Sequence, residues 1–449
     1  MLVPDSITYQ QMLILQLNSV AGHGRCRRRS AKVTASNKPC GKPGMMDSCS
    51  PPGLLSVDET IERLLASCPP PPPSETVPLA EALGRVLARE LRSPVAVPAH
   101  DNSAMDGYAV RTGDLANRRQ LPVSQYIPAG MAPQPLAAGS AARIFTGAPI
   151  PAGADAVVMQ EQCEAADGQV LLPERVLPGQ NIRRAGDDIR RGDLVLPAGL
   201  RLGPQALGLA ASVGAAELEV RRRLRIALLA TGNELAPPGQ PLAPGQIYDS
   251  NGPMAAALLT RLGYDVIGPG RLPDDLQATR SALAQVAEQA DAVITLGGVS
   301  VGEEDHVKPA VEALGALDLW RVAIKPGKPF AFGRIGTTPF LGLPGNPVSV
   351  FITFLLLARP YLARLQGRTL GQPPEFALPA GFEHARPDSR RQEYLRARIR
   401  NGSVEIHSRQ SSGVLSSTAW AEGLVRVEPG QVIRPGDRVP YIPLAELLS

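Results

Sequence analysis

Three turns rich in glycine and proline, each placed after an apolar run, constrain the fold of this chain more than any other feature. They cover residues 295–308 (TLGGVSVGEEDHVK), 325–329 (KPGKP) and 342–349 (GLPGNPVS), and two of them run directly into a helical pattern. Ligands of open α/β sheets bind in the crevice beyond the carboxyl ends of the strands. Glycine lets the backbone approach a ligand closely, and a helix N-terminus offers free N–H groups to anions. The sequence therefore predicts an α/β sheet that binds phosphate-like oxyanions.

Composition limits the functional classes. The 449 residues are enough for about three domains. Because the 46 basic and 42 acidic residues are interspersed, the charge pattern does not favour nucleic-acid binding. Five cysteines without CxxC spacing indicate free thiols in a reducing cytoplasm. The longest apolar run, near residues 348–358, is shorter than the roughly 18 residues of a membrane span. We therefore expect a cytoplasmic protein that binds neither nucleic acid nor membranes.

The first half of the chain mixes short helices with β-rich runs. Residues 54–66 form an amphipathic helical pattern in which Ser56 and Glu59 have the spacing of a capping box. Residues 81–90 predict a second short helix. Between residues 108 and 176, short runs with high β-propensity are separated by Pro-Gly turns, which predicts a small β-rich domain.

From residue 224 onward, apolar strands alternate with helical patterns. The expected order is strand 224–230, helix 252–262, strand 266–268, helix 275–289, strand 292–296, helix 307–314, strands 320–324 and 330–332, and helix 347–365. Strands separated by helices of this length predict βαβ units in a mostly parallel sheet. After about residue 371 the pattern returns to short strands and turns, which predicts a small all-β domain at the C-terminus.

Carboxylates follow the first strand of the predicted α/β sheet. Glu234 lies in the turn after that strand, at the edge where ligands bind. Asp249, Ser250 and Asn251 precede the next helix. Ser250 and Asn251 are equally well explained as helix caps or as ligand contacts. Asp249 is one residue too early to cap the helix alone, which favours a functional role for it.

The turn at residues 295–308 carries the strongest signal. Gly297, Gly298 and Ser300 form an open turn, followed by the acidic residues 303–305. Acidic residues in a first helical turn are usually structural. Mg²⁺ nevertheless takes one or two carboxylates plus phosphate oxygens, and we assign that role to Asp305.

Two lysines flank the rigid Pro-Gly pair of the second turn. The prolines and glycine of residues 325–329 fix the backbone, so the ammonium groups of Lys325 and Lys328 are expected to aim at one oxyanion. Upstream, residues 98–110 (PAHDNSAMDGYAV) and 145–148 (FTGA) are too varied for generic turns, but alone they do not identify a chemistry.

Six motifs in one order make the chain similar to the molybdopterin molybdenumtransferase family, which includes the gephyrin E domain. They are residues 102–109 (NSAMDGYA), 145–148 (FTGA), 185–189 (AGDDI), 297–305 (GGVSVGEED), 325–329 (KPGKP) and 343–347 (LPGNP). The resemblance extends over about residues 54–449. Any one motif would be weak, whereas six with this spacing are specific.

The resemblance implies a multidomain α/β plus all-β fold and an elongated homodimer of four-domain subunits. The expected parts are an extension outside the family fold (1–50), a discontinuous helical and extended linking domain (51–97 and 186–222), a β-rich domain (98–185), a three-layer, mostly parallel α/β domain that binds molybdopterin (223–370), and a small C-terminal β-barrel (371–449). The β-rich domain of one subunit would face the α/β domain of the other.

The implied reaction inserts molybdate into adenylated molybdopterin, releases AMP and requires Mg²⁺. Matching positions imply catalytic roles for Asp106, Thr146, Asp188, Glu234, Asp249 and Asp305, with Asp305 and Glu234 as metal ligands. Substrate binding would involve Gly297, Gly298, Ser300, Pro344, Gly345, Asn346 and Pro347. Molybdate would contact Lys325, Lys328 and Ser349, with Arg396 and Ser416 completing its site. The reacting sulfurs belong to the pterin, so no protein nucleophile is expected.

Two differences from the family pattern and two other functional classes bear on this interpretation. His306 stands where the family usually has an aromatic residue, and the first 46 residues have no counterpart. No adenylyltransferase domain is fused, so a separate enzyme would supply the adenylated substrate, and apo-molybdoenzymes would receive the product. An adenylyltransferase and a binding scaffold are the alternatives. The sequence does not decide between molybdate and tungstate.

Overall fold

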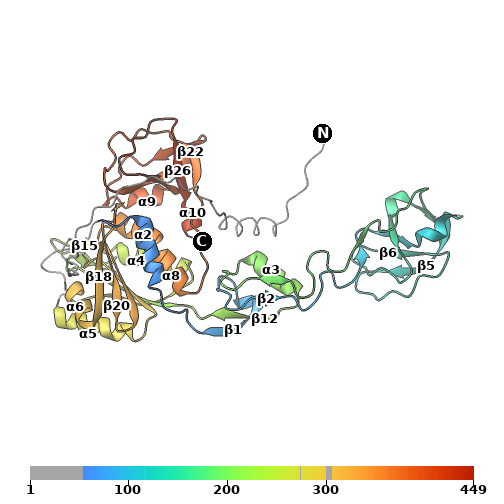
Figure 1. Ribbon diagram of the computed structural model, residues 1–449, viewed down its shortest axis with the longest axis horizontal. Coiled ribbons are helices and arrows are strands. Elements are labelled where there is room, and N and C mark those ends of the chain that lie inside the picture. Colours follow the sequence, from blue (N-terminus) through green and yellow to red (C-terminus); the bar gives the residue numbers. More distant parts are fainter. Residues whose placement is uncertain (1–53, 117, 274, 300–305, 449) are drawn as a thin grey trace, which may run out of the picture. The chain divides into compact units, whose positions relative to one another are not determined.

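The computed structural model describes residues 54–116, 118–273, 275–299 and 306–448, whose elements are labelled in Figure 1. The first helix, α2 (Val57–Ala66), confirms the predicted capping box. The Ser56 hydroxyl accepts a hydrogen bond from the Glu59 amide at 3.1 Å, and the Glu59 carboxylate accepts one from the Ser56 amide at 2.9 Å. Two of the N–H groups that a helix start leaves unpaired are thereby satisfied.

After α2, strands from two stretches that are far apart in the sequence pair with each other. The paired strands are β1 (Ser74–Pro78) with β12 (Glu217–Arg221), and β2 (Leu91–Arg92) with β11 (Leu194–Leu196). Between β11 and β12 lies the helix α3 (Pro204–Ser212). The helix predicted at residues 81–90 is wrong. Only the 3₁₀ turn Leu79–Glu81 forms, because Gly84 takes a left-handed φ of +74° and Leu87 donates its amide to Leu200 instead. Long-range strand pairing has overridden local helix propensity.

The predicted β-rich region contains a six-stranded sheet. Its order is β7-β4-β6-β5-β9-β8, with β4 (Gly107–Val110), β5 (Gln120–Ile127), β6 (Ala141–Ile144), β7 (Ala156–Met159), β8 (Glu164–Ala166) and β9 (Gln169–Leu171); β3 (Asn102–Ser103) pairs with β10 (Ile182–Arg183). Gly107 permits the tight packing of β4 on β7, since a Cβ there would lie 1.9 Å from the Val158 carbonyl oxygen. This packing positions the neighbouring residue Asp106.

The second half of the described chain is organised around a mixed six-stranded sheet. Its order is β16-β13-β17-β21-β20-β18, with β13 (Arg225–Ala230), β16 (Asp265–Arg271), β17 (Ala292–Leu296), β18 (Gly315–Arg321), β20 (Pro329–Ile335) and β21 (Thr338–Leu343). The first four strands in this order are parallel, whereas β20 and β18 are antiparallel additions at one edge. The prediction of a mostly parallel sheet is confirmed.

Helices cover both faces of this sheet, which gives three layers. On one side lie α2, α4 (Asn251–Arg261) and α8 (Arg359–Leu365), and on the other α5 (Leu276–Ala287) and α6 (Val307–Leu314) (Figure 1). Alternate residues of β13 enter the two cores: Ile226 contributes to the first and Ala227 to the second. A parallel strand buried on both faces reads as a continuous apolar run, which is how β13 was recognised in the sequence.

The long apolar helix predicted at residues 347–365 is α7 (Pro347–Thr353), a π-helical segment (Phe354–Ala358) and α8. By length and composition this stretch resembles a membrane span, but 89% of its apolar window is buried in the protein. It serves here as the central helix of the larger core.

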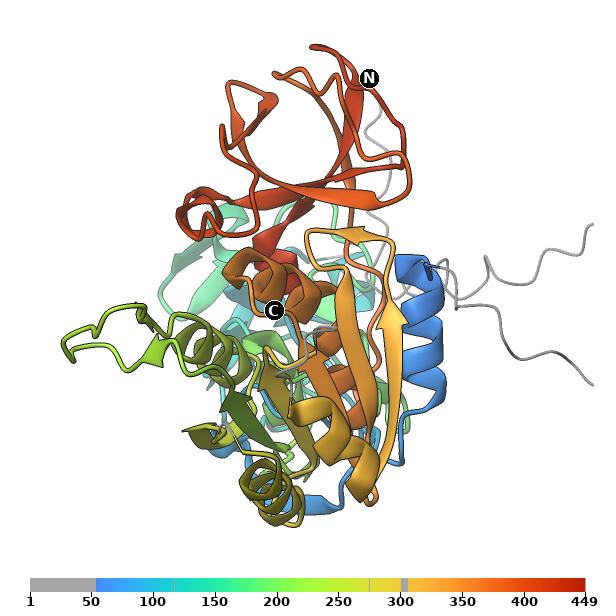
Figure 2. The ribbon, with the colours of Figure 1, turned by 90° about the vertical axis from the view of Figure 1, so that its left-hand side faces the viewer.

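The C-terminal residues form a strongly curved sheet, drawn in orange and red in Figure 2. Its strands are β22 (Phe376–Pro379), β23 (Gln392–Arg400), β24 (Ser403–Ile406), β25 (Gly423–Val427) and β26 (Arg438–Pro443), followed by α10 (Leu444–Leu447). A short strand from the preceding α/β region, β19 (Ile324–Lys325), pairs in parallel with β23 and places Lys325 opposite Glu393. The lysine-bearing turn is thereby fixed to the C-terminal sheet.

Candidate functional site

A crevice of about 1140 Å³ lies at the carboxyl ends of β13, β17 and β21. β13 connects through α4 to β16 on one side and is flanked by β17 on the other, so the strand order reverses beside β13. Such a switch point is where open α/β sheets bind ligands. The crevice thus lies where the sequence predicted a site.

The crevice brings together most of the α/β residues singled out in the sequence. The predicted residues among its lining are Glu234, Gly297, Gly298, Lys325, Lys328, Pro344, Gly345, Asn346, Pro347 and Ser349. Ser300 and Asp305 lie outside the described residues. The C-terminal domain adds Arg391 and residues 410–413, which the sequence did not indicate.

Two consecutive glycines shape the floor of the crevice. Gly297 and Gly298 have φ values of +89° and +68°, a backbone region that disfavours side chains. A Cβ on Gly298 would also lie 2.6 Å from Cγ2 of Val307. Glycine is therefore required here for conformation as well as for close approach to a ligand.

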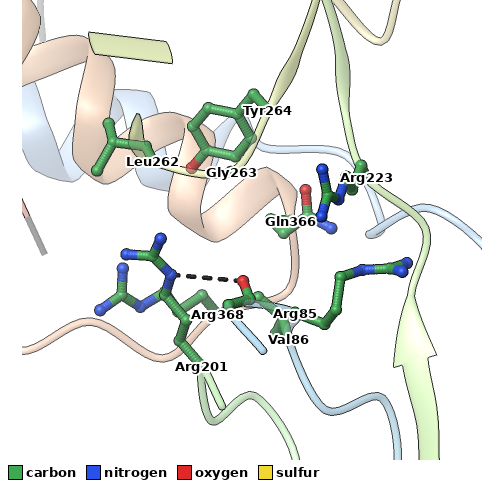
Figure 3. Close-up of a pocket in the computed structure, with 10 residues that line it drawn as sticks. Arg85, Val86, Arg201, Arg223, Leu262, Gly263, Tyr264, Gln366 and Arg368 are labelled. Carbon is green, nitrogen blue, oxygen red and sulfur yellow. Dashed lines mark hydrogen bonds between the residues drawn. The ribbon is translucent and has the colours of Figure 1, made fainter. Parts of the chain in front are cut away.

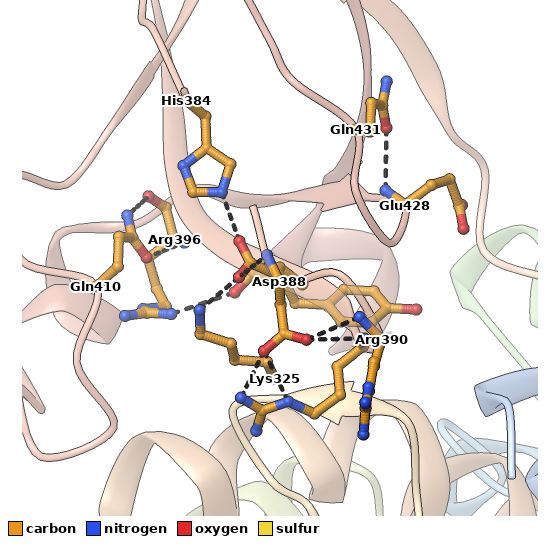
Figure 4. A network of polar contacts seen from close by, with 11 residues as sticks. Lys325, His384, Asp388, Arg390, Arg396, Gln410, Glu428 and Gln431 are labelled. Atoms are coloured by element: carbon orange, nitrogen blue, oxygen red, sulfur yellow. Dashed lines mark hydrogen bonds and ion pairs between the residues drawn. The ribbon is translucent and has the colours of Figure 1, made fainter. Parts of the chain in front are cut away.

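Lys325 is held by a buried carboxylate from the C-terminal sheet (Figure 4). Its Nζ lies 2.5 Å from Oε1 of Glu393, whose side chain is only 2% exposed. The same carboxylate contacts Nε2 of His384 at 2.5 Å and accepts the amide of Asp388 at 3.1 Å. Burial raises the pKa of Glu393, but the bonds from Lys325 and His384 outweigh burial, so the net pKa is lowered. Glu393 is therefore anionic and fixes the lysine electrostatically.

Lys328 contrasts with Lys325. Its side chain is exposed and makes no hydrogen bond or ion pair with the residues that the structure describes, while its carbonyl accepts the amide of Val322 at 3.1 Å. Between the lysines, Gly327 has a φ of +119°, and a Cβ there would lie 2.4 Å from Cγ2 of Thr353. The turn is thus rigid, with one ammonium group anchored and the other open to solvent.

The start of α4 corrects one expectation. The Asp249 carboxylate accepts the Gly252 amide at 2.9 Å, so it caps the helix, whereas the Ser250 side chain makes no capping bond. Asn251 instead faces the crevice, donating its amide to the Gly345 carbonyl at 2.7 Å. Its buried side-chain oxygen has no hydrogen-bond partner among the described residues. A capping residue can act one position earlier than assumed, because its side chain spans the extra distance.

Metal-binding capacity is modest in the described part of the crevice. Glu234 is an exposed carboxylate in the turn after β13. Among the described residues, no group of three or more His, Cys, Asp or Glu side chains is placed to hold a metal ion. The crevice therefore offers one carboxylate and the unpaired Asn251 oxygen, with Asp305 beyond the described part.

Asp106 and Thr146 meet in the β-rich region. The amide and the hydroxyl of Thr146 donate to Oδ1 of Asp106 at 2.7 and 2.8 Å. These bonds, first that of the backbone amide, lower the pKa of Asp106 and keep it ionised. Asp188 is exposed and makes no side-chain hydrogen bond within the described chain. None of the three residues lines the crevice.

Arg396 lies behind the crevice. Its side chain is 1% exposed, with Nε 3.1 Å from the Ser417 hydroxyl and Nη1 3.2 Å from the Tyr394 carbonyl, and burial lowers its pKa to about 10. Its Nη2 has no hydrogen-bond partner in the part of the chain that the structure describes. Ser416 begins α9 (Ser416–Trp420), and it is Ser417 that touches the arginine. The crevice-lining Gln410 accepts the Arg396 amide at 3.0 Å, so the arginine sits one layer below the surface.

Known proteins resemble this chain over nearly all of its described length. Residues 55–214 match the MoeA N-terminal region (domain I and II), 227–364 a probable molybdopterin-binding domain, and 383–444 the MoeA C-terminal region (domain IV). The molybdopterin molybdenumtransferase of Haemophilus influenzae is 46% identical over 72% of this chain and 81% of its own. That of Synechococcus elongatus is 38% identical over 82% and 95%. The crystal structure of the MoeA molybdopterin biosynthesis protein from Pyrococcus horikoshii aligns with a TM-score of 0.76 and 28% identity, covering 87% of this chain and 100% of that one.

Proposed function

This chain belongs to the molybdopterin molybdenumtransferase family, and we propose that its crevice is where molybdate meets the pterin substrate. It is a transferase of molybdenum cofactor biosynthesis that inserts molybdenum into molybdopterin. The observation that carries the proposed location is the rigid lysine turn, which presents one anchored and one free ammonium group to a crevice of about 1140 Å³.

In the proposed reaction the pterin enters in its adenylated form, and AMP leaves. Molybdate and the AMP phosphate are both tetrahedral oxyanions, which fixed amides and cations bind well. Lys325, Lys328 and Ser349 would hold molybdate, and the turns at residues 297–298 and 344–347 would cradle the adenylated pterin. Catalysis then consists of positioning and charge stabilisation.

The cysteines support a reaction without a protein nucleophile. The described crevice lining contains none. Burial raises the pKa of both described cysteines, Cys68 and Cys163, to about 11, so each stays a neutral thiol. The thiolate is the reactive form of cysteine. The sulfurs that receive the metal are accordingly those of the pterin.

Mg²⁺ fits the oxygen donors at the crevice. It accepts one or two carboxylates and retains several waters, and Glu234 together with the unpaired Asn251 oxygen belongs to that donor class. We propose Glu234 and Asp305 as the carboxylates that hold it. When bound, Mg²⁺ would neutralise charge on the phosphate oxygens. The Asp305→Ala variant should fold normally but lose Mg²⁺-dependent turnover; unchanged turnover would remove Asp305 from the site.

We further propose a cytoplasmic homodimer with the four-domain organisation set out above. Thr146 and Asp188 are exposed and Asp106 is half-buried, and none of the three lines its own subunit's crevice, which supports their acting on the crevice of a partner subunit. In this arrangement the adenylylating enzyme supplies the substrate and apo-molybdoenzymes receive the product. Mixing Asp106→Asn and Lys325→Ala subunits should restore up to a quarter of the activity, roughly, if sites are shared by two chains. No restoration in verified heterodimers would contradict shared sites.

The function is tested by following AMP release from adenylated molybdopterin in the presence of Mg²⁺ and molybdate. Molybdate-dependent AMP release, with transfer of active cofactor to an apo-molybdoenzyme, is the expected result. Consumption of ATP and molybdopterin with release of pyrophosphate would instead indicate an adenylyltransferase. Substrate binding without either activity would indicate a binding protein. The same assay with tungstate determines the preferred oxyanion.

A further inference from the structure

A second cavity, away from the crevice, is too small to hold a substrate. Its lining includes Arg201, Tyr264 and Arg368, and Arg201 donates to the Gly84 carbonyl at 3.4 Å beside it (Figure 3). Its volume of about 20 Å³ is close to the roughly 10–15 Å³ that one water molecule needs. The residues that tune substrate binding are therefore those that surround the crevice.

His384 contacts the carboxylate that holds Lys325, but it does not itself line the crevice (Figure 4). Its Nε2 lies 2.5 Å from Oε2 of Glu393, whereas Nζ of Lys325 lies 2.5 Å from Oε1 of the same side chain. An ionised carboxylate only accepts hydrogen bonds, so Nε2 of His384 carries a hydrogen and donates it to Glu393. The histidine and the lysine thus bind opposite oxygens of one carboxylate.

His384 is held more firmly than Lys325. The His384 amide donates to the Ile433 carbonyl at 2.9 Å and its carbonyl accepts the Ile433 amide at 3.2 Å, which fixes its backbone within the C-terminal domain. Its side chain is 20% exposed, whereas that of Lys325 is 44% exposed. Glu393 therefore has a fixed donor on one oxygen and a more mobile cation on the other.

The bond from His384 limits how the buried Glu393 carboxylate can turn. Lys325 and the Asp388 amide both donate to Oε1, whereas His384 donates to Oε2. A buried carboxylate oxygen without a donor is unfavourable, so loss of the imidazole would favour rotation of the carboxylate toward another partner. Such a rotation would move Oε1 away from the position in which it holds Lys325.

We propose that His384 is a positioning residue of the crevice: by donating to Oε2 of Glu393, it orients Oε1 to hold Lys325 where an oxyanion binds. The inference rests on the proposed function, in which Lys325 contacts molybdate. His384 acts on the anion only through Glu393 and Lys325, so its replacement should weaken the binding of molybdate and leave the fold intact.

Molybdate binding to the full-length protein, measured by calorimetry, tests the role of the imidazole. His384→Leu keeps most of the side-chain volume but removes the donor, and we expect it to weaken molybdate binding about fivefold, the usual effect of one hydrogen bond. His384→Gln is the matched control, because its side-chain amide can donate from nearly the position of Nε2; it should bind as the wild type does. Wild-type affinity in His384→Leu, or equal losses in both variants, would overturn the proposal.

A double-mutant cycle separates positioning from a general structural role. If His384 acts through the lysine, His384→Leu should change molybdate affinity by less than about twofold in the Lys325→Ala background. It should likewise have little effect in the Glu393→Gln background. A full additional loss in either background would show that His384 acts by another route and would overturn the proposal. If His384→Leu does not fold, His384→Asn replaces it, since its amide is too short to reach Oε2.

The hold on Lys325 can also be measured without molybdate. In the wild type, acetic anhydride should label Lys325 more slowly than Lys328, because the nitrogen of Lys325 is engaged by Glu393 and Lys328 is exposed on the same turn. Mass spectrometry should show the Lys325 rate approaching that of Lys328 in His384→Leu but not in His384→Gln. An unchanged ratio of the two rates in His384→Leu would overturn the proposal. Absence of molybdate binding in the wild type would instead contradict the proposed function, and the labelling ratio would still decide the role of His384.

Discussion

The crevice and the β-rich region each hold one ionic side chain in a fixed position, but they do so differently. In the crevice, the charge of Lys325 meets a carboxylate from another domain, Glu393, while Lys328 stays in water. In the β-rich region, the Asp106 carboxylate accepts the amide and the hydroxyl of Thr146 at 2.7 and 2.8 Å. A lysine paired across two domains is positioned before the ligand arrives and can exchange its partner for the ligand. The Asp106 carboxylate is instead held by hydrogen bonds from its own domain, so its position does not depend on another domain.

The largest effect should come from removing both crevice lysines. Lys325→Ala/Lys328→Ala should lower molybdate-dependent AMP release by about 10²–10³-fold, the usual consequence of losing donors to a developing charge. The molybdate requirement should rise more than pterin binding weakens. AMP-release kinetics over a molybdate series check this, with Arg334→Ala as the control. Equal loss of molybdate and pterin binding would mean that the turn has a general structural role.

Removal of the anchoring carboxylate should have a smaller effect. Glu393→Gln keeps the shape of the side chain but loses its charge, so Lys325 should become mobile while still present. We expect the molybdate concentration for half-maximal rate to rise about tenfold, corresponding to one charge-assisted contact of roughly 1.4 kcal/mol. In a double-mutant cycle with Lys325→Ala the two effects should be non-additive. Additive losses would show that Glu393 does not act through the lysine.

Whether a feature of the fold or the site could be predicted from the sequence depends on how far apart in the sequence its interacting residues lie. The crevice turns follow buried strands, so the positions of Gly297 and Gly298 could be predicted from local pattern. The capping box of α2 is equally local. Glu393 could not be found in this way, because it lies 68 residues from Lys325 and the pair depends on the pairing of β19 with β23.

Two errors have the same origin. Residues 81–90 have helical propensity, but the partner strand near residue 200 supplies hydrogen bonds that an isolated segment lacks. Asp249 seemed too early to cap α4, yet the chain turns so that its carboxylate reaches the Gly252 amide. Sequence patterns report local geometry and miss what tertiary packing brings together.

Lowering the pH should test how much the Glu393 carboxylate contributes to the stability of the fold. The pKa of Glu393 is lower in the folded protein than its usual value, so its stabilising contribution is complete above the unfolded pKa and is lost as the pH falls through the folded pKa. Urea unfolding between pH 7 and pH 3 should therefore show a steeper loss of stability in the wild type than in Glu393→Gln. Arg334→Gln, which removes an exposed arginine bonded only to the Gly336 carbonyl in the described structure, should follow the wild-type profile.

Asp388 must be considered in the same experiment. Its bonds from Arg391, opposed by burial, lower its pKa to about 2. Because Asp388 is present in both proteins, its contribution is common to the two curves. Parallel curves for wild type and Glu393→Gln would show that the carboxylate gains nothing from Lys325 and His384 on folding, and the contrast between the two sites would disappear.

The smallest expected effect is the loss of the α2 helix cap, and it serves as the reference for the other predictions. Ser56→Ala removes the hydroxyl that caps α2, which should cost about 1 kcal/mol in the free energy of unfolding. The cap lies in neither site, so the loss should be the same with and without molybdate, and AMP release should be unchanged at temperatures where the protein stays folded. Urea unfolding monitored by circular dichroism gives the value, with Ser56→Asp as a variant that retains capping. If Ser56→Ala altered the response to molybdate, α2 would couple to the crevice, and changes at Lys325 could no longer be interpreted as local.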